Sequence, residues 1–291
     1  MPKKVRIPKK DTVAGPFLRW AGSKRKLLHK LMPYWSERNL RYVEPFAGSA
    51  ALFYAINPNE AILSDSNQEL VRTFEQVRDN AARVYECLSE LPLGRESFYR
   101  LRALDPHQLR SAERAARFIF LNRFCFNGLY RTNAKGHFNV PYAATKTGGL
   151  PPRSVFLRSA GLLAKANLYC GDFQRVLEVH VRKGDFVYLD PPYAVGNRRI
   201  FNQYGPHTFG LHDLERLRLI LREIDQRKAT FVLTYAWCRE ATTVFAEWGQ
   251  RRVYTQRNIA GFAKHRRTAA ELIVSNFVVQ QASARKGASR A

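Results

Sequence analysis

Short apolar runs of strand length recur along the chain, separated by stretches in which apolar residues lie three or four positions apart. We expect strands within 41–48, 60–65, 167–173, 185–193 and 229–235, and a further buried strand within 270–279 that pairs with 252–256 in a hairpin. Helical spacing is clearest at 50–56 and 211–224. Strands that alternate with helices predict an α/β fold with a doubly wound, mostly parallel sheet.

The middle of the chain interrupts this alternation. Apolar positions from Leu70 to Leu91 step by four and three, which predicts one buried face of a long helix. A second helix is expected over 111–124, followed by a stretch, 122–142, with turn residues, aromatic residues and positive charges but no sustained period. We therefore predict a mainly helical domain, 70–166, inserted into a domain formed by 15–69 and 167–280.

Both ends of the chain, 1–14 and 281–291, are basic and have almost no apolar periodicity. Such compositions predict a flexible arm and a flexible tail. For the arm, two interpretations remain open: a solvated tail, or a segment that adds contacts to DNA phosphates.

The net charge of the chain indicates which kind of partner this globular protein binds. The 48 Lys and Arg against 24 Asp and Glu leave a net charge of +24, which attracts polyanions. Nucleic acid is the expected partner; an anionic membrane surface competes with it, but no apolar segment is long enough to span a bilayer and no signal peptide opens the chain. We expect a cytoplasmic protein. Four scattered cysteines and seven scattered histidines form no recognisable ligand pattern, so we predict no metal.

The stretch FVYLDPPYAV, residues 186–195, ends a strand abruptly because proline cannot donate to a sheet ladder. Ligands bind at the carboxyl ends of strands in open α/β sheets, so Asp190 and Tyr193 are candidate site residues. The alternative is an ordinary strand followed by a Pro-Pro turn.

Two other stretches could contact a ligand. In YVEPFAGSAALFY, Gly48 follows a strand and precedes a helix, where backbone N–H groups can approach a ligand. Asp65 ends the next strand, 21 positions after Glu44, a spacing that suits a ribose hydroxyl, although capping of the following helix is an equal alternative. In FLRWAGSKRKLL, Trp20 and Lys24 lie on either side of a glycine turn and could hold a ligand. The alternative is that the turn only begins a surface helix.

These stretches occur in the order FLRWAGSK, VEPFAGSAALF, Asp65, NRFCFNGLYRTNAKGHFNVPY, GDF and DPPY. In that order, from about residue 17 to 277, the chain resembles the Dam-like, alpha-group (D12 class) adenine-N6 DNA methyltransferases. The resemblance implies a Rossmann-like methyltransferase sheet and S-adenosylmethionine as cofactor, with no metal. It implies these cofactor-binding residues: Trp20, Lys24, Glu44, Phe46, Gly48, Asp65, Asp172 and Phe173. The family commonly has a second glycine where this chain has Ala50, which narrows the expected pocket.

The resemblance also implies the chemistry of DPPY, formed by Asp190, Pro191, Pro192 and Tyr193. The lone pair of an adenine amino group is delocalised into the ring, so an enzyme must localise it. Asp190 and the Pro191 carbonyl would accept the two N6 hydrogens, and Tyr193 would stack on the base. Because N6 is buried in a duplex, the base would be flipped out.

The same resemblance implies that the residues that recognise the DNA target sequence lie largely in the inserted domain. The implied DNA-contacting residues are Arg19, Phe126, Asn127, Leu129, Arg131 and Pro141, with Arg131 suited to a bidentate guanine contact. Phe126 replaces a tyrosine that is often found there. For each arginine, a phosphate contact or a solvated surface is the alternative. The loop 258–267 is basic and glycine-containing, and could also contact DNA.

The expected function is therefore site-specific transfer of a methyl group to adenine N6 in double-stranded DNA. Two alternatives remain: methylation of RNA adenine or of DNA cytosine N4, and a non-catalytic DNA-binding scaffold. Whether the protein is a monomer or a homodimer, which sequence it recognises, and whether a restriction endonuclease accompanies it are left open.

Overall fold

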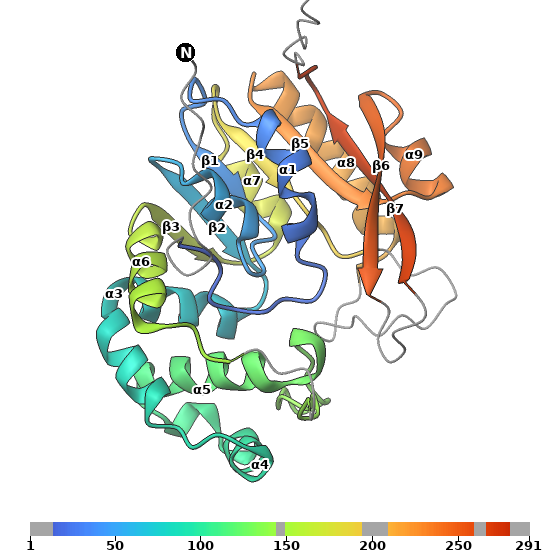
Figure 1. Ribbon diagram of the computed structural model, residues 1–291. Helices are drawn as coiled ribbons and strands as arrows, with labels where there is room; N and C mark the ends of the chain where they lie inside the picture. Colours follow the sequence, from blue (N-terminus) through green and yellow to red (C-terminus); the bar gives the residue numbers. More distant parts are fainter. Residues whose placement is uncertain (1–13, 144–148, 194–208, 259–265, 280–291) are drawn as a thin grey trace, which may run out of the picture.

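The computed structural model describes residues 14–143, 149–193, 209–258 and 266–279, with the side chains of 256–258, 266 and 267 left out (Figure 1). All but the last residue of the predicted arm at 1–14, the whole tail at 281–291 and most of the predicted loop at 258–267 therefore lie outside the described residues.

A seven-stranded sheet forms the centre of the described chain, with the order β3-β2-β1-β4-β5-β7-β6. The strands are β1 (Tyr42–Glu44), β2 (Ala61–Asp65), β3 (Ala166–Cys170), β4 (Phe186–Leu189), β5 (Thr230–Ala236), β6 (Gly249–Asn258) and β7 (Arg266–Ser275). The first five strands pair in parallel, while β7 is antiparallel to both β5 and β6. This confirms the predicted α/β class and the hairpin near the end of the chain.

Helices cover both faces of the sheet (Figure 1). On one side lie the 3₁₀ helices η1 (Lys24–Leu27) and η2 (Met32–Tyr34) and the helices α1 (Leu28–Leu31) and α2 (Ala51–Ile56), which share a core cluster with Tyr42 and Phe186. On the other side, α7 (Phe173–His180), α8 (Leu211–Gln226) and α9 (Arg239–Val244) share a second cluster with Val43 and Val187. Neighbouring residues of one strand thus face opposite cores, as the period of a strand requires.

The helical insertion lies between β2 and β3. It contains α3 (Gln68–Ser89), α4 (Arg95–Ala103), α5 (Ser111–Phe124) and α6 (Arg153–Leu163), with short 3₁₀ helices η3 (Pro106–Gln108) and η4 (Phe126–Gly128). Isolated bridges join Cys125 to Tyr142 and Thr132 to Phe138 in an irregular hairpin. The insertion packs beneath the sheet in Figure 1, and Leu70 and Phe74 of α3 belong to the same core cluster as α2.

The strand order places β1 and β4 side by side at the centre of the sheet, where the direction of chain winding reverses. Such a switch point opens a crevice at the carboxyl ends of the strands. DPPY follows β4, and the Gly48 loop follows β1. The topology therefore brings these two stretches to one edge of the sheet.

Candidate active site

Asp190 directly follows β4, and its carboxylate is held by two side chains from distant parts of the sequence. Lys24 Nζ lies 2.6 Å from Asp190 Oδ1, and the Thr234 hydroxyl donates to the same oxygen at 2.9 Å. Thr234 lies in β5, beside β4, and also exchanges a hydrogen bond with Tyr188. Both contacts to the Asp190 carboxylate reach Oδ1, and among the described residues no hydrogen bond is made to Oδ2.

Burial and pairing act in opposite directions on this ion pair. Burial raises the pKa of Asp190 above its usual value, while the charge and hydrogen bond of Lys24 and the hydrogen bond of Thr234 pull it down. Burial lowers the pKa of Lys24, but the negative charge of Asp190, with further contributions from Tyr193 and Glu271, more than offsets this and raises it. Lys24 therefore stays protonated and favours the ionised form of Asp190.

Tyr193 completes the DPPY motif beside this pair, after the buried Pro191 and the half-buried Pro192. Its hydroxyl donates to Glu271 Oε2 at 2.7 Å, and its ring centroid lies 5.2 Å from Lys24 Nζ. Its ring meets Tyr235 edge to face, with 4.9 Å between centroids. Thr234 and Glu271 were not predicted as site residues. A signal existed for Glu271, a lone carboxylate inside the apolar run AELIVS.

The Gly48 loop approaches Trp20 so closely that only glycine fits. Gly48 has φ +48°, and a Cβ there would lie 2.7 Å from Trp20 Cδ1. Its N–H donates to Asp65 Oδ2 at 3.0 Å, while the N–H of Asn67 donates to Asp65 Oδ1 at 2.9 Å. The alternative in which Asp65 caps the next helix is wrong, because Asn67 caps α3 by accepting from the Glu69 and Leu70 N–H groups.

Two further loop residues have unusual environments. Glu44, at the end of β1, is buried and accepts a hydrogen bond from the Tyr42 hydroxyl at 3.0 Å. Burial raises the pKa of Glu44 well above its usual range, and this outweighs the opposing effect of that hydrogen bond. Ala50, where relatives often have glycine, is fully buried with φ 52°, a left-handed conformation that glycine adopts more easily.

Asp172 and Phe173 lie at the start of α7, beyond the end of β3. Asp172 caps the helix by accepting from the Gln174 N–H at 3.0 Å and pairs with Arg216 at 2.6 Å. The Phe173 ring lies 5.1 Å from the Phe46 ring, and the Arg216 guanidinium covers it at 4.8 Å. The structure therefore brings Phe46 of one motif against Phe173 of another.

Arg19 lies against the first turn of the predicted DNA-reading stretch. Asn122 of α5 accepts from the Arg19 N–H at 2.8 Å and donates to the Arg19 carbonyl at 2.5 Å. A Cβ on Gly128, which has φ +63°, would lie 2.9 Å from the Arg19 carbonyl carbon. Trp20, the next residue, stacks on Tyr130 at 6.2 Å. The FLRWAGSK stretch therefore packs between the Gly48 loop and the helical insertion.

The other predicted DNA-contacting residues lie along the irregular hairpin. Phe126 is 40% exposed and its N–H donates to the carbonyl of the exposed Pro141 at 2.9 Å. Asn127 is exposed with φ 55°, and Leu129 is half-buried. Arg131 is half-buried and its Nε donates to Asn139 Oδ1 at 2.7 Å, which orients the guanidinium.

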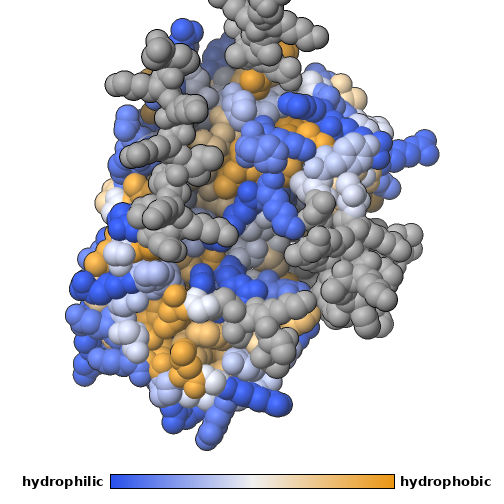
Figure 2. Space-filling model, viewed as in Figure 1, coloured by the Kyte–Doolittle hydropathy of each residue, from blue (hydrophilic) through white to orange (hydrophobic). Residues whose placement is uncertain are grey.

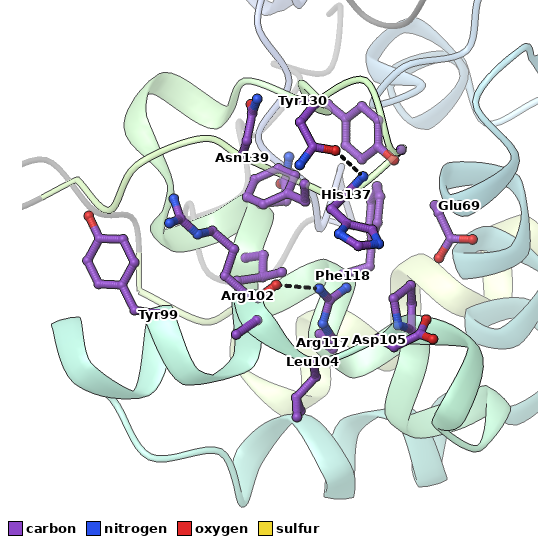
Figure 3. A pocket seen from close by; sticks show the side chains of 17 residues that line it. Glu69, Tyr99, Arg102, Leu104, Asp105, Arg117, Phe118, Tyr130, His137 and Asn139 are labelled. Atoms are coloured by element: carbon purple, nitrogen blue, oxygen red, sulfur yellow. Dashed lines mark hydrogen bonds between the residues drawn. The ribbon is translucent and has the colours of Figure 1, made fainter.

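A cavity of about 410 Å³ lies among the helices of the insertion, and Asp190 is not part of its lining (Figure 3). Its wall includes Phe118, Tyr130, His137 and the buried Arg117, which donates to the Arg102 carbonyl. Tyr130 lines this cavity and also stacks on Trp20, and Asn139, which binds Arg131, lines it as well. The cavity therefore adjoins the hairpin that is predicted to contact DNA. In Figure 2, hydrophobic residues gather over this lower, helical part, while hydrophilic residues cover much of the rest of that face.

Within the described ranges, no group of three His, Cys, Asp or Glu side chains could hold a metal ion, and the absence of a metal stays a prediction. All four cysteines are free. None of the described helices is long and apolar enough to cross a membrane.

Comparisons with known proteins converge on one class. A family model described as D12 class N6 adenine-specific DNA methyltransferase matches residues 20–259. The chain is 30% identical to the Type II methyltransferase M1.LlaDCHI of Lactococcus lactis subsp. cremoris, over 90% of this chain and 95% of that one. It is 34% identical to the Type II methyltransferase M.MjaIII of Methanocaldococcus jannaschii, over 76% and 84%, and 31% identical to a DNA adenine methylase of Haemophilus influenzae, over 89% and 92%.

Proposed function

The chain belongs to the D12 class N6 adenine-specific DNA methyltransferases, and from that membership we propose that it methylates adenines at a short specific sequence after flipping each target base out of duplex DNA, with S-adenosylmethionine as the methyl donor. The family establishes methylation of adenine N6 in DNA. The cofactor, the extrusion of the base and the roles of single residues are the proposal.

The residues at the strand ends fit such a cofactor. Gly48 lets the Trp20 ring pack directly on the loop after β1, and the Asp65 carboxylate, which accepts from the Gly48 N–H, suits a pair of ribose hydroxyls. The adjoining rings of Phe46 and Phe173 form an apolar wall suited to a nucleobase. Lys24 and Glu44 lie near Asp190, Trp20 packs on Gly48, and Asp172 is the exposed neighbour of Phe173, so each could flank the cofactor. When bound, S-adenosylmethionine supplies an electrophilic methyl group on a sulfonium.

Asp190 is the proposed acceptor for the adenine amine. Because Lys24 and Thr234 both contact Oδ1, Oδ2 can accept one N6 hydrogen, and the Pro191 carbonyl can accept the other. Lys24 keeps the carboxylate ionised, so that it accepts rather than donates. Two fixed acceptors draw the nitrogen lone pair out of conjugation and stabilise the positive charge that develops on N6. Tyr193 offers its ring to the extruded base, and its stacking offsets part of the unstacking cost of a few kcal/mol.

We propose residues 15–69 and 167–280 as the catalytic domain and 70–166 as the target-recognition domain. Arg19, Phe126, Asn127, Leu129, Arg131 and Pro141 would contact DNA. Their support is that Arg19 packs on Gly128, which lies between Asn127 and Leu129, and that the Phe126 N–H donates to the Pro141 carbonyl. The bond to Asn139 orients Arg131 for base reading. The net charge of +24 suits a duplex partner.

The observation that carries the proposal is the 2.6 Å pair of Lys24 and Asp190 at the end of β4. The test uses tritiated S-adenosylmethionine and unmethylated plasmid DNA. We expect transfer by the wild-type protein, loss of transfer in Asp190→Ala, and cofactor affinity within a few-fold of wild type. Digestion of the product to nucleosides should yield N6-methyladenine. Labelled N4-methylcytosine, transfer only to RNA, or full transfer by Asp190→Ala would contradict the proposal.

A further inference from the structure

Glu271 is a buried carboxylate inside an otherwise apolar strand. It is 3% exposed, while the next three residues of β7, Leu272, Ile273 and Val274, are at most 1% exposed. Its backbone lies opposite Ala236 of β5 and Val253 of β6. Burying a carboxylate costs free energy, and an apolar side chain at this position would be expected to make the fold more stable. The presence of a carboxylate here therefore points to a specific task.

The contacts of Glu271 point to that task. Its Oε2 accepts the hydrogen bond from the Tyr193 hydroxyl at 2.7 Å, a short bond of the charge-assisted kind. Glu271 also lies near enough to Lys24 and Asp190 to contribute to the electrostatics of both. The antiparallel β7 thereby reaches the catalytic motif that follows β4, although β5 lies between the two strands.

The ring of Tyr193 needs such an anchor. Tyr193 lies beyond the end of β4, where two prolines have already ended the sheet ladder, so no strand pairing holds it. Tyr235 contacts the ring edge to face at 4.9 Å and Lys24 lies 5.2 Å from its centre. These contacts restrain the ring on two sides, and the bond to Glu271 fixes the position of its hydroxyl end.

We propose that Glu271 is a positioning residue, which holds the Tyr193 ring in the orientation that stacks on an extruded purine while Asp190 accepts its amine. The inference rests on the proposed function, because it assigns Tyr193 to the target base. Glu271 acts through Tyr193 and does not touch the substrate. A misplaced ring would slow the reaction of the bound base far more than it would weaken binding of the cofactor.

Three variants distinguish a role of Glu271 in positioning Tyr193 from an effect of its negative charge and from a failure to fold. Tyr193→Phe keeps the ring and removes the hydroxyl, Glu271→Leu removes the acceptor, and Glu271→Gln keeps an acceptor oxygen without the charge. Ser275→Ala is the control, since Ser275 is a buried polar residue of the same strand whose hydroxyl bonds to the Phe277 carbonyl. Single-turnover methyl transfer to unmethylated plasmid DNA and cofactor affinity are measured for each variant.

We expect Tyr193→Phe and Glu271→Leu each to lower the single-turnover rate about tenfold, equivalent to about 1.4 kcal/mol. The double variant should be no slower than the slower single variant, because removing the Tyr193 hydroxyl costs nothing further once its acceptor is gone. Glu271→Gln should recover most of the rate, and cofactor affinity should stay within about twofold throughout. Ser275→Ala should transfer at the wild-type rate.

The inference is overturned if Tyr193→Phe transfers at the wild-type rate, or if the losses in the double variant multiply. Tyr193→Phe keeps these outcomes decisive even if Glu271→Leu fails to fold, because it leaves the ring contacts in place. A wild-type protein that transfers no methyl group to DNA would instead contradict the proposed function itself.

Discussion

Replacing Lys24 by methionine should move the acid limb of the pH–rate profile to higher pH. Methionine keeps much of the length and apolar surface of the lysine side chain but removes the ammonium that lies 2.6 Å from Asp190 Oδ1. Burial already raises the pKa of Asp190, and Lys24 is the main opposing influence. Without it, the pKa of the carboxyl should rise further.

The size of the effect follows from the geometry. An opposite charge within about 4 Å commonly lowers the pKa of a carboxyl by roughly 1 to 3 units, and each unit is worth about 1.4 kcal/mol. Only the ionised form accepts the amine, and its fraction falls as the pH drops through the pKa of the folded protein. A higher pKa therefore shifts the acid limb upward by at least about one unit. The same shift affects folding. As the pH rises from the ordinary carboxyl pKa to the raised pKa of Asp190, the free energy of unfolding of the variant should fall relative to that of wild type.

The assay is single-turnover tritium transfer to plasmid DNA from pH 5 to 9 at saturating cofactor, since Lys24 is also proposed to flank the cofactor. Lys26→Met, an exposed lysine of the same 3₁₀ helix, is the matched control and should keep the wild-type profile. An acid limb that does not move in Lys24→Met, although the rate falls, would refute the assigned effect of Lys24 on Asp190.

Two further predictions concern Gly48 and the end of β1 that precedes it. Gly48→Ala places a methyl group 2.7 Å from the Trp20 ring at φ +48°, so we expect at least tenfold weaker binding of S-adenosylmethionine by calorimetry; unchanged affinity would show that the loop can move freely. Glu44→Gln tests the buried carboxyl at the end of β1, whose raised pKa means that the wild-type protein loses stability as the pH rises from the ordinary carboxyl range to that higher pKa. Gln cannot ionise, so the free energy of unfolding of the variant minus that of wild type, from urea titrations, should grow with pH across this window; a constant or shrinking difference would contradict this reasoning.

Local pattern predicted the elements of the fold. The apolar runs at β1, β2, β4 and β5 and the stripe of α3 were all visible in the sequence, because strand and helix periods are set by neighbouring residues. The capping of α3 was predicted less well. Asp65 and Asn67 have equally suitable side chains, and only the bond from the Gly48 N–H shows that Asp65 turns toward the loop after β1.

The site depended on contacts that no local pattern contains. The pairs Lys24 with Asp190 and Tyr193 with Glu271 join residues far apart in the sequence, which only the tertiary fold brings together. Ala50 was noted as a departure from the glycine common in relatives. Its buried, left-handed backbone now gives the physical reason for that preference.

The proposed role of Asp190 is to accept hydrogen bonds from the amino group of an adenine flipped out of duplex DNA. Single-molecule sequencing of DNA from a host that expresses the protein reports both the modified base and the surrounding sequence. We expect N6-methyladenine at one short sequence with the wild-type protein and none with an equally abundant Asp190→Ala protein. Persistent methylation with Asp190→Ala, or modification of cytosine instead of adenine, would refute this role.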